Sequence, residues 1–261
     1  MLLCLDIGNT HILGGVFNQD NLIARFRYAT NLIGTADQFG IFLVNILQTN
    51  NITVHDISAI AVSSVVPSCD YTIKHTNSLY FKSLYFMLQA GVKTGLNVKY
   101  KNPNEVGADR IANAIGAINA FPNRNLIIID MGTATTIDAI TKKRDYLGGS
   151  ILPGMRLGME SLRTNTAKLM EVDIETPSVF VGRTTRESIQ AGLYHGQLGA
   201  LKEIIHGMKQ EVFRDESPLI IGTGGFSQLF REKNLFDVIL PDLVLQGLHK
   251  AYEYSVQHDV K

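Results

Sequence analysis

The sequence predicts an α/β protein made of two similar halves that divide near residue 120. Two observations lead to this prediction: a strand–turn–strand motif that occurs twice, and an order of strands and helices that restarts at the second copy. The motif spans residues 2–17 and recurs at residues 126–141. Each copy has a hydrophobic run, an Asp (Asp6 or Asp130), a Gly close behind it, a Thr and a second hydrophobic run. Two such copies in one chain indicate a duplicated unit.

The turn of each motif has the composition of a phosphate-binding loop. A Gly in the turn supplies positive φ and lets backbone N–H groups approach an anion, while the Asp can hold a cation that accompanies phosphate. One copy alone would be explained equally well as an ordinary hairpin turn. Two copies on halves that face each other across a cleft would place both turns on one ligand, and this favours the phosphate interpretation.

The first half, residues 1–120, has its elements in a regular order. Alternating apolar residues predict a third strand over residues 22–28, directly after the hairpin. Helical spacing of apolar side chains and a polar start predict a helix that opens at residues 35–38. The remaining predicted elements are short strands at 57–63 and 84–88, a helix or turn from Pro67, and a helix that opens within 104–110 and ends before Phe121 and Pro122.

The second half, residues 121–261, again opens with three strands. They are predicted at residues 126–130, 136–141 and 146–152. After them come a helix from Pro153, a long helix over 184–212, strands at 219–221 and 238–240, and a closing helix over 243–256. Because no linker or low-complexity segment separates the halves, we expect them to pack closely.

Composition indicates an ordinary globular chain. Of its 261 residues 45% are hydrophobic and 18% charged, and 24 basic residues balance 24 acidic ones, so nothing attracts nucleic acid or anionic lipid. Its two cysteines, Cys4 and Cys69, lack the spacing of a metal site or a disulfide framework. The sequence shows neither a signal peptide nor an apolar run of about 18 residues. We therefore expect a cytoplasmic protein that binds neither nucleic acid nor membrane.

The sharpest polar cluster outside the repeats is Gly107-Ala108-Asp109-Arg110, which Tyr100 precedes. An Asp beside an Arg at a helix start is commonly a capping carboxylate with a surface ion pair. The position between the two halves favours a function instead. The cluster offers an acid, a cation, a Gly for close approach and a nearby tyrosine hydroxyl, which together can hold a small anionic acceptor and take a proton from its hydroxyl.

The motifs, taken in order, resemble those of type III pantothenate kinases over nearly the whole chain. The resemblance implies the actin-like, ribonuclease H-like fold shared by acetate and sugar kinases, Hsp70 and actin. It also implies ATP-dependent phosphorylation of pantothenate to 4'-phosphopantothenate, the first step of coenzyme A biosynthesis, by a homodimer with pantothenate pockets at or near the subunit interface. Such enzymes need a divalent cation (Mg²⁺) and a monovalent one (K⁺ or NH₄⁺). The matching segments are 6–10, 107–110, 130–136, 147–149 with 153–154, 182–185 and 190–192.

The same resemblance implies roles for individual residues. Asp109 matches the catalytic base, and Arg110 is expected to bind the pantothenate carboxylate and to keep Asp109 ionised. Asp130 resembles the ligand of the monovalent cation, and Thr133 an ATP contact. The implied ATP loop, with Asp6 near Mg²⁺, comprises Asp6, Ile7, Gly8, Asn9, Thr10, His11, Ile12 and Leu13. The implied contacts of pantothenate are Tyr100, Gly107, Ala108, Asp109, Arg110 and Thr185.

Other interpretations compete with a kinase. An actin- or Hsp70-like assembly protein would carry large inserted subdomains or a client domain, for which 261 residues leave no room. A regulatory relative without turnover would differ at few positions, and the intact Asp6, Asp109, Arg110 and Asp130 argue against it. A phosphohistidine at His11 is set aside because histidines beside strands are far more often structural. Superfamily relatives place an adenosine loop at the turn 222–225, but this family holds adenine loosely, so we leave that turn out of the site.

Overall fold

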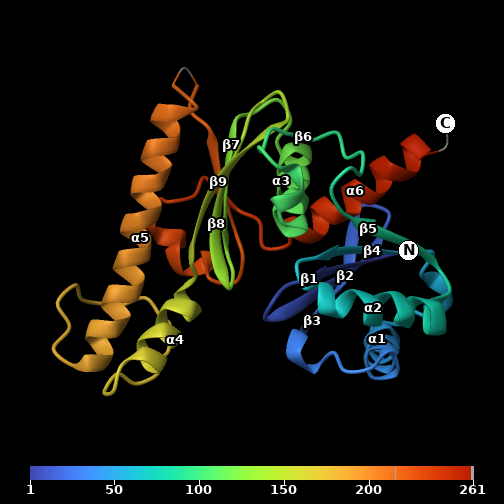
Figure 1. Ribbon diagram of the computed structural model, residues 1–261, viewed down its shortest axis with the longest axis horizontal. Coiled ribbons are helices and arrows are strands. Elements are labelled where there is room, and N and C mark those ends of the chain that lie inside the picture. Colours follow the sequence, from blue (N-terminus) through green and yellow to red (C-terminus); the bar gives the residue numbers. More distant parts are fainter. Residues whose placement is uncertain (215, 260–261) are drawn as a thin grey trace. The chain divides into compact units, whose positions relative to one another are not determined.

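The computed structural model describes residues 1–214 and 216–259 and confirms the predicted α/β class (Figure 1). The chain forms two compact units. One comprises residues 1–120 together with the closing helix, and the other comprises residues 121–242. Each unit has its own sheet and its own hydrophobic core.

The sheet of the first unit has the order β3-β2-β1-β4-β5. Antiparallel pairing joins β1 to β2 and β2 to β3, whereas β1 pairs parallel with β4 and β4 with β5. The predicted three-strand opening is therefore correct, and the later strands add on the other side of β1. The strands are β1 (Leu2–Ile7), β2 (His11–Asn18), β3 (Asn21–Ala29), β4 (Ala59–Ser64) and β5 (Leu84–Leu88).

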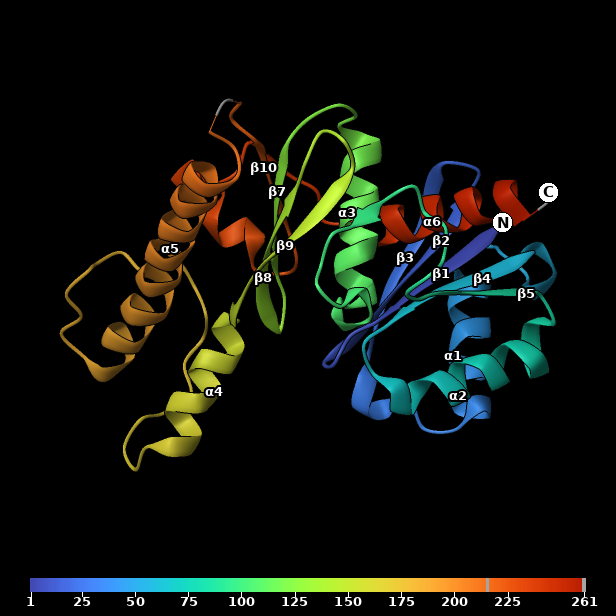
Figure 2. The same cartoon turned by 45° about the horizontal axis from the view of Figure 1, so that its top comes forward.

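Helices cover both faces of this sheet (Figure 2). On one face α1 (Ala36–Thr49) and α2 (Pro67–Thr76) pack against Leu3, Leu5 and Ile7 of β1. On the other face α3 (Ala108–Ala120) and α6 (Leu243–Asp259) pack against Leu2 and Cys4. The alternation along β1 thus divides its side chains between two apolar layers. A π-helical turn (Asn77–Phe81) extends α2, and the short β6 (Asn97–Val98) precedes α3.

The second unit repeats the strand arrangement of the first. Its order is β11-β10-β7-β8-β9. β7 is antiparallel to β8 and parallel to β10, β8 is antiparallel to β9, and β10 is parallel to β11. Each of these pairings matches a pairing of the first sheet, with β7 in the place of β1. The strands are β7 (Leu126–Met131), β8 (Ala134–Ile140), β9 (Asp145–Pro153), β10 (Leu219–Thr223) and β11 (Val238–Ile239).

Two helices belong to the second unit. α4 (Met155–Asn165) follows β9 directly, and α5 (Thr185–Glu211) is the long helix that the sequence predicts over 184–212. Met155 of α4 and Tyr194 and Leu201 of α5 are buried in the core with the inward-facing isoleucines of β7. No helix of the described chain is long and apolar enough to cross a membrane.

The closing helix α6 groups with the first unit, whereas the sequence division at 121–261 placed it in the second half. The reason is close packing against α3. A Cβ atom on Gly116 of α3 would lie 2.6 Å from the carbonyl oxygen of Leu243, and one on Gly247 of α6 would overlap the backbone of Ala112. Paired glycines therefore let the two helix backbones approach, and Leu245 and its neighbours on α6 complete the apolar layer over β1 and β4. A helical pattern along one segment does not show which sheet the helix covers.

Candidate active site

The turn between β1 and β2 is held by hydrogen bonds from both sides. The Gly8 N–H donates to the carbonyl oxygen of His11 at 3.1 Å and closes the turn. Buried Thr30 donates its hydroxyl to the Gly8 carbonyl at 2.7 Å and its N–H to the Thr10 carbonyl at 3.0 Å. Asn9 is left exposed at the tip. The predicted ATP loop, Asp6 to Leu13, is therefore a braced hairpin with an exposed polar tip.

The second hairpin, between β7 and β8, is braced in a similar way. The Gly132 N–H donates to the Ala134 carbonyl at 3.1 Å, and the Gly154 N–H donates to the Thr133 carbonyl at 3.1 Å. A Cβ atom on Gly154 would overlap that Thr133 carbonyl, so only glycine allows the start of α4 to lie against the turn. Asp130 and Thr133, both predicted site residues, lie together in this hairpin.

The two hairpin aspartates occupy equivalent places. Asp6 is the penultimate residue of β1 and pairs in register with Leu13, and Asp130 is the penultimate residue of β7 and pairs with Thr136. In each unit the segment after the parallel neighbour strand bonds back to the last residue of the first strand. Val65 donates its N–H to the carbonyl of Ile7 at 3.1 Å, and Phe226 does the same to Met131 at 3.1 Å. The two units thus share even individual backbone hydrogen bonds.

The cluster Gly107–Arg110 lies at the start of α3, beside the end of β4. A Cβ atom on Gly107 would meet the carboxylate of Asp109 and would lie 3.4 Å from Cγ1 of Val65. Because Val65 is bonded to the last residue of β1, Asp109 lies at the same end of the sheet as the Asp6 hairpin. The structure therefore brings two of the predicted site segments together within the first unit.

Burial dominates the electrostatics of Asp109. It raises the pKa of the Asp109 carboxyl above its ordinary value near 3.8, while the hydrogen bond from the Arg110 N–H (2.8 Å) and the charge of Arg110 act in the opposite direction. The sequence expectation that Arg110 keeps this carboxylate ionised accounts only for the weaker effect. A carboxylate with raised pKa is a better proton acceptor, as a general base requires. Arg110 itself is only 6% exposed, so its charge is focused in a dry environment.

Other predicted site residues lie apart from these clusters. Tyr100 follows β6 in the irregular segment before α3 and is half-buried. Thr185 is the first residue of α5 and is exposed; the preceding Thr184 caps this helix by accepting the Glu187 N–H at 3.2 Å. Thr185 thus lies on the helix that the sequence predicts over 184–212, and Tyr100 lies in the segment before α3.

The turn after β10 contributes more than the sequence indicates. Thr223 pairs in register with Asp130, and Gly224 adopts a φ of +82°. A Cβ atom on Gly224 would overlap the Asp130 carboxylate, so this turn forms a wall of the Asp130 site. The signal that could have found it is the run Gly222-Thr223-Gly224-Gly225 directly after a buried parallel strand.

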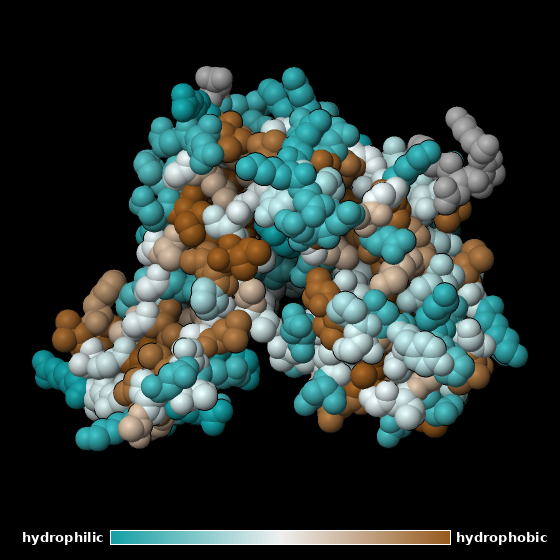
Figure 3. Space-filling model, in the orientation of Figure 1, coloured by the Kyte–Doolittle hydropathy of each residue, from teal (hydrophilic) through white to brown (hydrophobic). Residues whose placement is uncertain are grey.

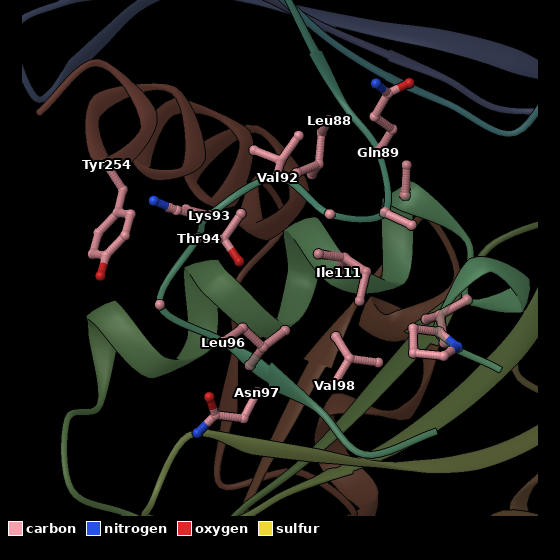
Figure 4. Close-up of a pocket in the computed structure, with 16 residues that line it drawn as sticks. Leu88, Gln89, Val92, Lys93, Thr94, Leu96, Asn97, Val98, Ile111 and Tyr254 are labelled. Atoms are coloured by element: carbon pink, nitrogen blue, oxygen red, sulfur yellow. The ribbon is translucent and has the colours of Figure 1, made fainter. Parts of the chain in front are cut away.

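A cavity of about 420 Å³ lies between the segment 89–98, α3 and α6. Leu96, Val98 and Ile111 line it, and Lys93 and Tyr254 stand at its edge (Figure 4). Its lining includes neither Asp6 nor Asp109. Its lining combines apolar side chains with polar ones such as Lys93 and Thr94, and it includes no residue of the Asp6 hairpin.

The repeated sheet with its two acidic hairpins defines the duplicated, actin-like class of α/β proteins. Two solved structures share this fold. A conserved putative Baf family transcriptional activator from Campylobacter jejuni superposes with a TM-score of 0.62 at 19% identity, covering 98% of this chain and 99% of that one. A putative 2-dehydro-3-deoxygalactonokinase from Sinorhizobium meliloti gives 0.57 at 11% identity, covering 97% and 98%. At these identities the likeness concerns the fold alone.

Sequence relatives identify the family within that class. The family model described as type III pantothenate kinase matches residues 2–207. A type III pantothenate kinase from Legionella pneumophila (strain Corby) is 53% identical over 251 residues, which are 96% of this chain and 98% of that protein. The chain belongs to the type III pantothenate kinase family. The family and enzyme class that the motifs suggest are thereby confirmed.

We predict that Asp109→Asn stabilises the protein at neutral pH. Because the folded pKa of Asp109 is raised, the stability that this group contributes is fully present below about 3.8 and is lost as the pH rises through the folded pKa. Asparagine still accepts the Arg110 N–H but has no charge to bury. Thermal midpoints between about pH 4 and pH 8 should show an advantage of the variant that grows with pH.

Asp56→Asn is the matched control with the opposite sign. Hydrogen bonds from Thr53 lower the pKa of exposed Asp56, so its contribution is present above about 3.8 and is lost as the pH falls through the folded value. That variant should lose stability at neutral pH. An Asp109→Asn advantage that is the same at every pH would contradict the burial argument.

Proposed function

We propose that this chain transfers the γ-phosphoryl group of ATP to the hydroxyl of pantothenate and forms 4'-phosphopantothenate, the first step of coenzyme A biosynthesis. Membership of the family supports this proposal. The structural observation that carries it is proximity: the Val65 N–H bonds to Ile7 beside the β1–β2 hairpin, and Val65 and the Asp109 carboxylate both lie close to Gly107. A phosphate loop and a buried base at one end of one sheet are what phosphoryl transfer to an alcohol requires.

Each residue has a role that follows from the chemistry. Phosphoryl transfer passes through a loose transition state, so the protein mainly aligns the reactants and neutralises charge. At the tip of this turn the exposed Asn9 and the backbone beside it would meet the phosphates, whereas the Gly8 N–H already closes the turn. Asp109 orients the pantothenate hydroxyl and accepts its proton, and buried Arg110 pairs with the pantothenate carboxylate. Tyr100 and Thr185 would complete the pantothenate site, and Thr133 would contact ATP.

Two cations are part of the proposal, and the side chains fit them. Asp6 offers the carboxylate oxygen that Mg²⁺ prefers. Asp130 stands opposite Thr136, whose buried hydroxyl finds no hydrogen-bond partner within the described residues. Oxygen ligands suit hard cations, and the family resemblance assigns a monovalent one, K⁺ or NH₄⁺, to Asp130. When bound, the two ions neutralise charge on the phosphates of ATP.

Kinetics of variants at these two adjacent positions test the roles of Asp109 and Arg110. Asp109→Asn should lower kcat about a hundredfold or more, because a positioned general base contributes on the order of 10² to 10⁴ in rate. Pantothenate and ATP affinity should change much less. Arg110→Ala should mainly weaken pantothenate binding. Calorimetric binding beside steady-state kinetics separates these effects. If kcat of Asp109→Asn stays within about threefold of wild type, Asp109 is only a capping residue.

The monovalent cation gives a separate prediction. Turnover should be several-fold to many-fold higher in K⁺ than in Na⁺ buffer of equal ionic strength, because the site at Asp130 is expected to select a larger, more weakly hydrated ion. Asp130→Asn should remove this difference, since the variant lacks the charge that holds the ion. Equal wild-type rates in the two buffers would contradict the proposed cation site.

We also propose that the protein is a homodimer and that the exposed face of α5 is its contact surface. Gly192, Gly196 and Gly199 lie on one side of this helix, and a Cβ atom on any of them would meet no other atom within 4 Å. Beside them Phe180 and Val181 are each 80% exposed. Figure 3 shows hydrophobic side chains on the surface over the segment that joins α4 to α5.

A second copy of the chain is the natural occupant of this face. Open glycines let another helix approach closely, and exposed apolar side chains are buried in a symmetric contact in which one patch meets itself. Thr185, which the family resemblance assigns to pantothenate, begins the same helix. The proposed dimer would thus bring Thr185 of each protomer to the shared surface.

Light scattering tests this dimer. The wild type should have twice the monomer mass, and Gly196→Arg should be monomeric, because the long charged side chain occupies the contact face. The monomer should bind pantothenate more weakly. Gln48→Arg, which adds the same charge at an exposed position of α1, should stay dimeric. A fully active wild-type monomer would refute the dimer, and a dimeric Gly196→Arg would refute the surface. The cytoplasmic location stays a prediction that cell fractionation can check.

A further inference from the structure

Ser63, near the end of β4, has a buried hydroxyl that the fold does not use. The residue is 0% exposed, and its Oγ finds no hydrogen-bond partner in the part of the chain that the structure describes. Its neighbour Ser64 behaves differently: it donates to Asp70 at 2.6 Å and accepts the Val66 N–H at 3.2 Å. Leaving a buried hydroxyl without a partner costs free energy, so we expect the Ser63 hydroxyl to bond to a group outside the polypeptide.

Ser63 lies directly beside Asp6. The two residues pair in register on the adjacent parallel strands β4 and β1, so their side chains project from the same face of the sheet. Alternation along the strands identifies that face. Leu5 and Val62 belong to the layer under α1 and α2, whereas Cys4 and Ala61 belong to the layer under α3 and α6. Asp6 and Ser63 continue the second series, on the face covered by α3, the helix that carries Asp109.

Packing alone does not explain a serine at this position. The preceding residues of β4 on the same face are Ala59 and Ala61, both 0% exposed. An alanine at position 63 would continue this series, would fill nearly the same volume and would leave no unsatisfied group. The hydroxyl is therefore an addition to a face that otherwise takes alanine.

The second unit has a hydroxyl at the equivalent position. Thr223 of β10 pairs in register with Asp130 of β7, as Ser63 pairs with Asp6, and Thr223 is 2% exposed. Each hairpin aspartate thus has a buried hydroxyl residue beside it on the parallel strand. The other residues of β1 and β7 are mostly aliphatic. The hydroxyl residue therefore recurs in both units next to the aspartate.

We propose that Ser63 is a positioning residue for the divalent cation of the nucleotide: its hydroxyl hydrogen bonds to a water ligand of the ion that Asp6 binds. This inference deepens the proposed function, on which it rests. Mg²⁺ keeps several of its waters when proteins bind it, and groups that hydrogen bond to these ligands orient the ion. No other role is available to Ser63 within the described fold, because its hydroxyl bonds to none of it.

Calorimetric titration of Ser63→Ala with ADP tests this role without relying on turnover. With Mg²⁺ present, the Kd for ADP should rise about tenfold, the lower end of what loss of an outer-shell partner costs. With EDTA in place of Mg²⁺, the Kd should equal that of wild type. The thermal midpoint of the ligand-free variant should be unchanged or higher, since no hydrogen bond of the fold is lost.

Thr76→Val is the matched control. The hydroxyl of Thr76 is also buried, but it donates to the carbonyls of Thr72 (2.8 Å) and Ala36 (3.2 Å), so its removal should lower the thermal midpoint and leave Mg²⁺-dependent ADP binding unchanged. A Ser63→Ala variant that is destabilised or unfolded, or whose Mg·ADP affinity stays within about twofold of wild type, overturns the inference. Absent pantothenate turnover with an intact Mg²⁺ effect would refute the proposed function alone.

Discussion

The position of β1 between an antiparallel and a parallel neighbour is the constraint on which the site depends. The antiparallel partner β2 creates a turn directly after Asp6, and the parallel partner β4 ends at the same level, so its following segment returns to the end of β1 through the Val65 N–H. A slip of one residue in either pairing would move Asp6 to the opposite face. The register of β2 and β4 against β1 therefore places a carboxylate, a hydrogen-bonded turn and the start of α3 at one end of the sheet.

Function at this end is obtained at some cost in stability. Burial raises the pKa of Asp109, which means that the folded protein holds a carboxylate where its charge is poorly solvated. Ser63 is buried, and its hydroxyl finds no hydrogen-bond partner among the described residues. These two local departures from optimal folding lie at Asp109 and beside Asp6. Active sites commonly show this pattern, because groups that must meet a ligand are not fully satisfied by the protein.

Much of the fold could be predicted from the sequence because its signals are local. Alternation and helical spacing indicate most strands and helices, and the repeated motif indicates the duplication. The segment from Pro67, which forms α2, is predicted only as a helix or turn. The grouping of α6 with the first unit depends on the Gly116–Gly247 approach, which joins distant segments. The raised pKa of Asp109 and the isolated hydroxyl of Ser63 depend on burial, and the wall that Gly224 adds to Asp130 depends on register. A single sequence shows neither burial nor strand register directly.

The central claim is that this chain phosphorylates pantothenate, and direct identification of the product tests it best. The protein would be incubated with ATP, Mg²⁺ and K⁺, with pantothenate in one sample and a sugar acceptor in another, and the products followed by phosphorus NMR and mass spectrometry. We expect one phosphate monoester on pantothenate for each ADP formed and no sugar phosphate. Release of ADP without phosphopantothenate, or transfer to the sugar alone, would contradict the account.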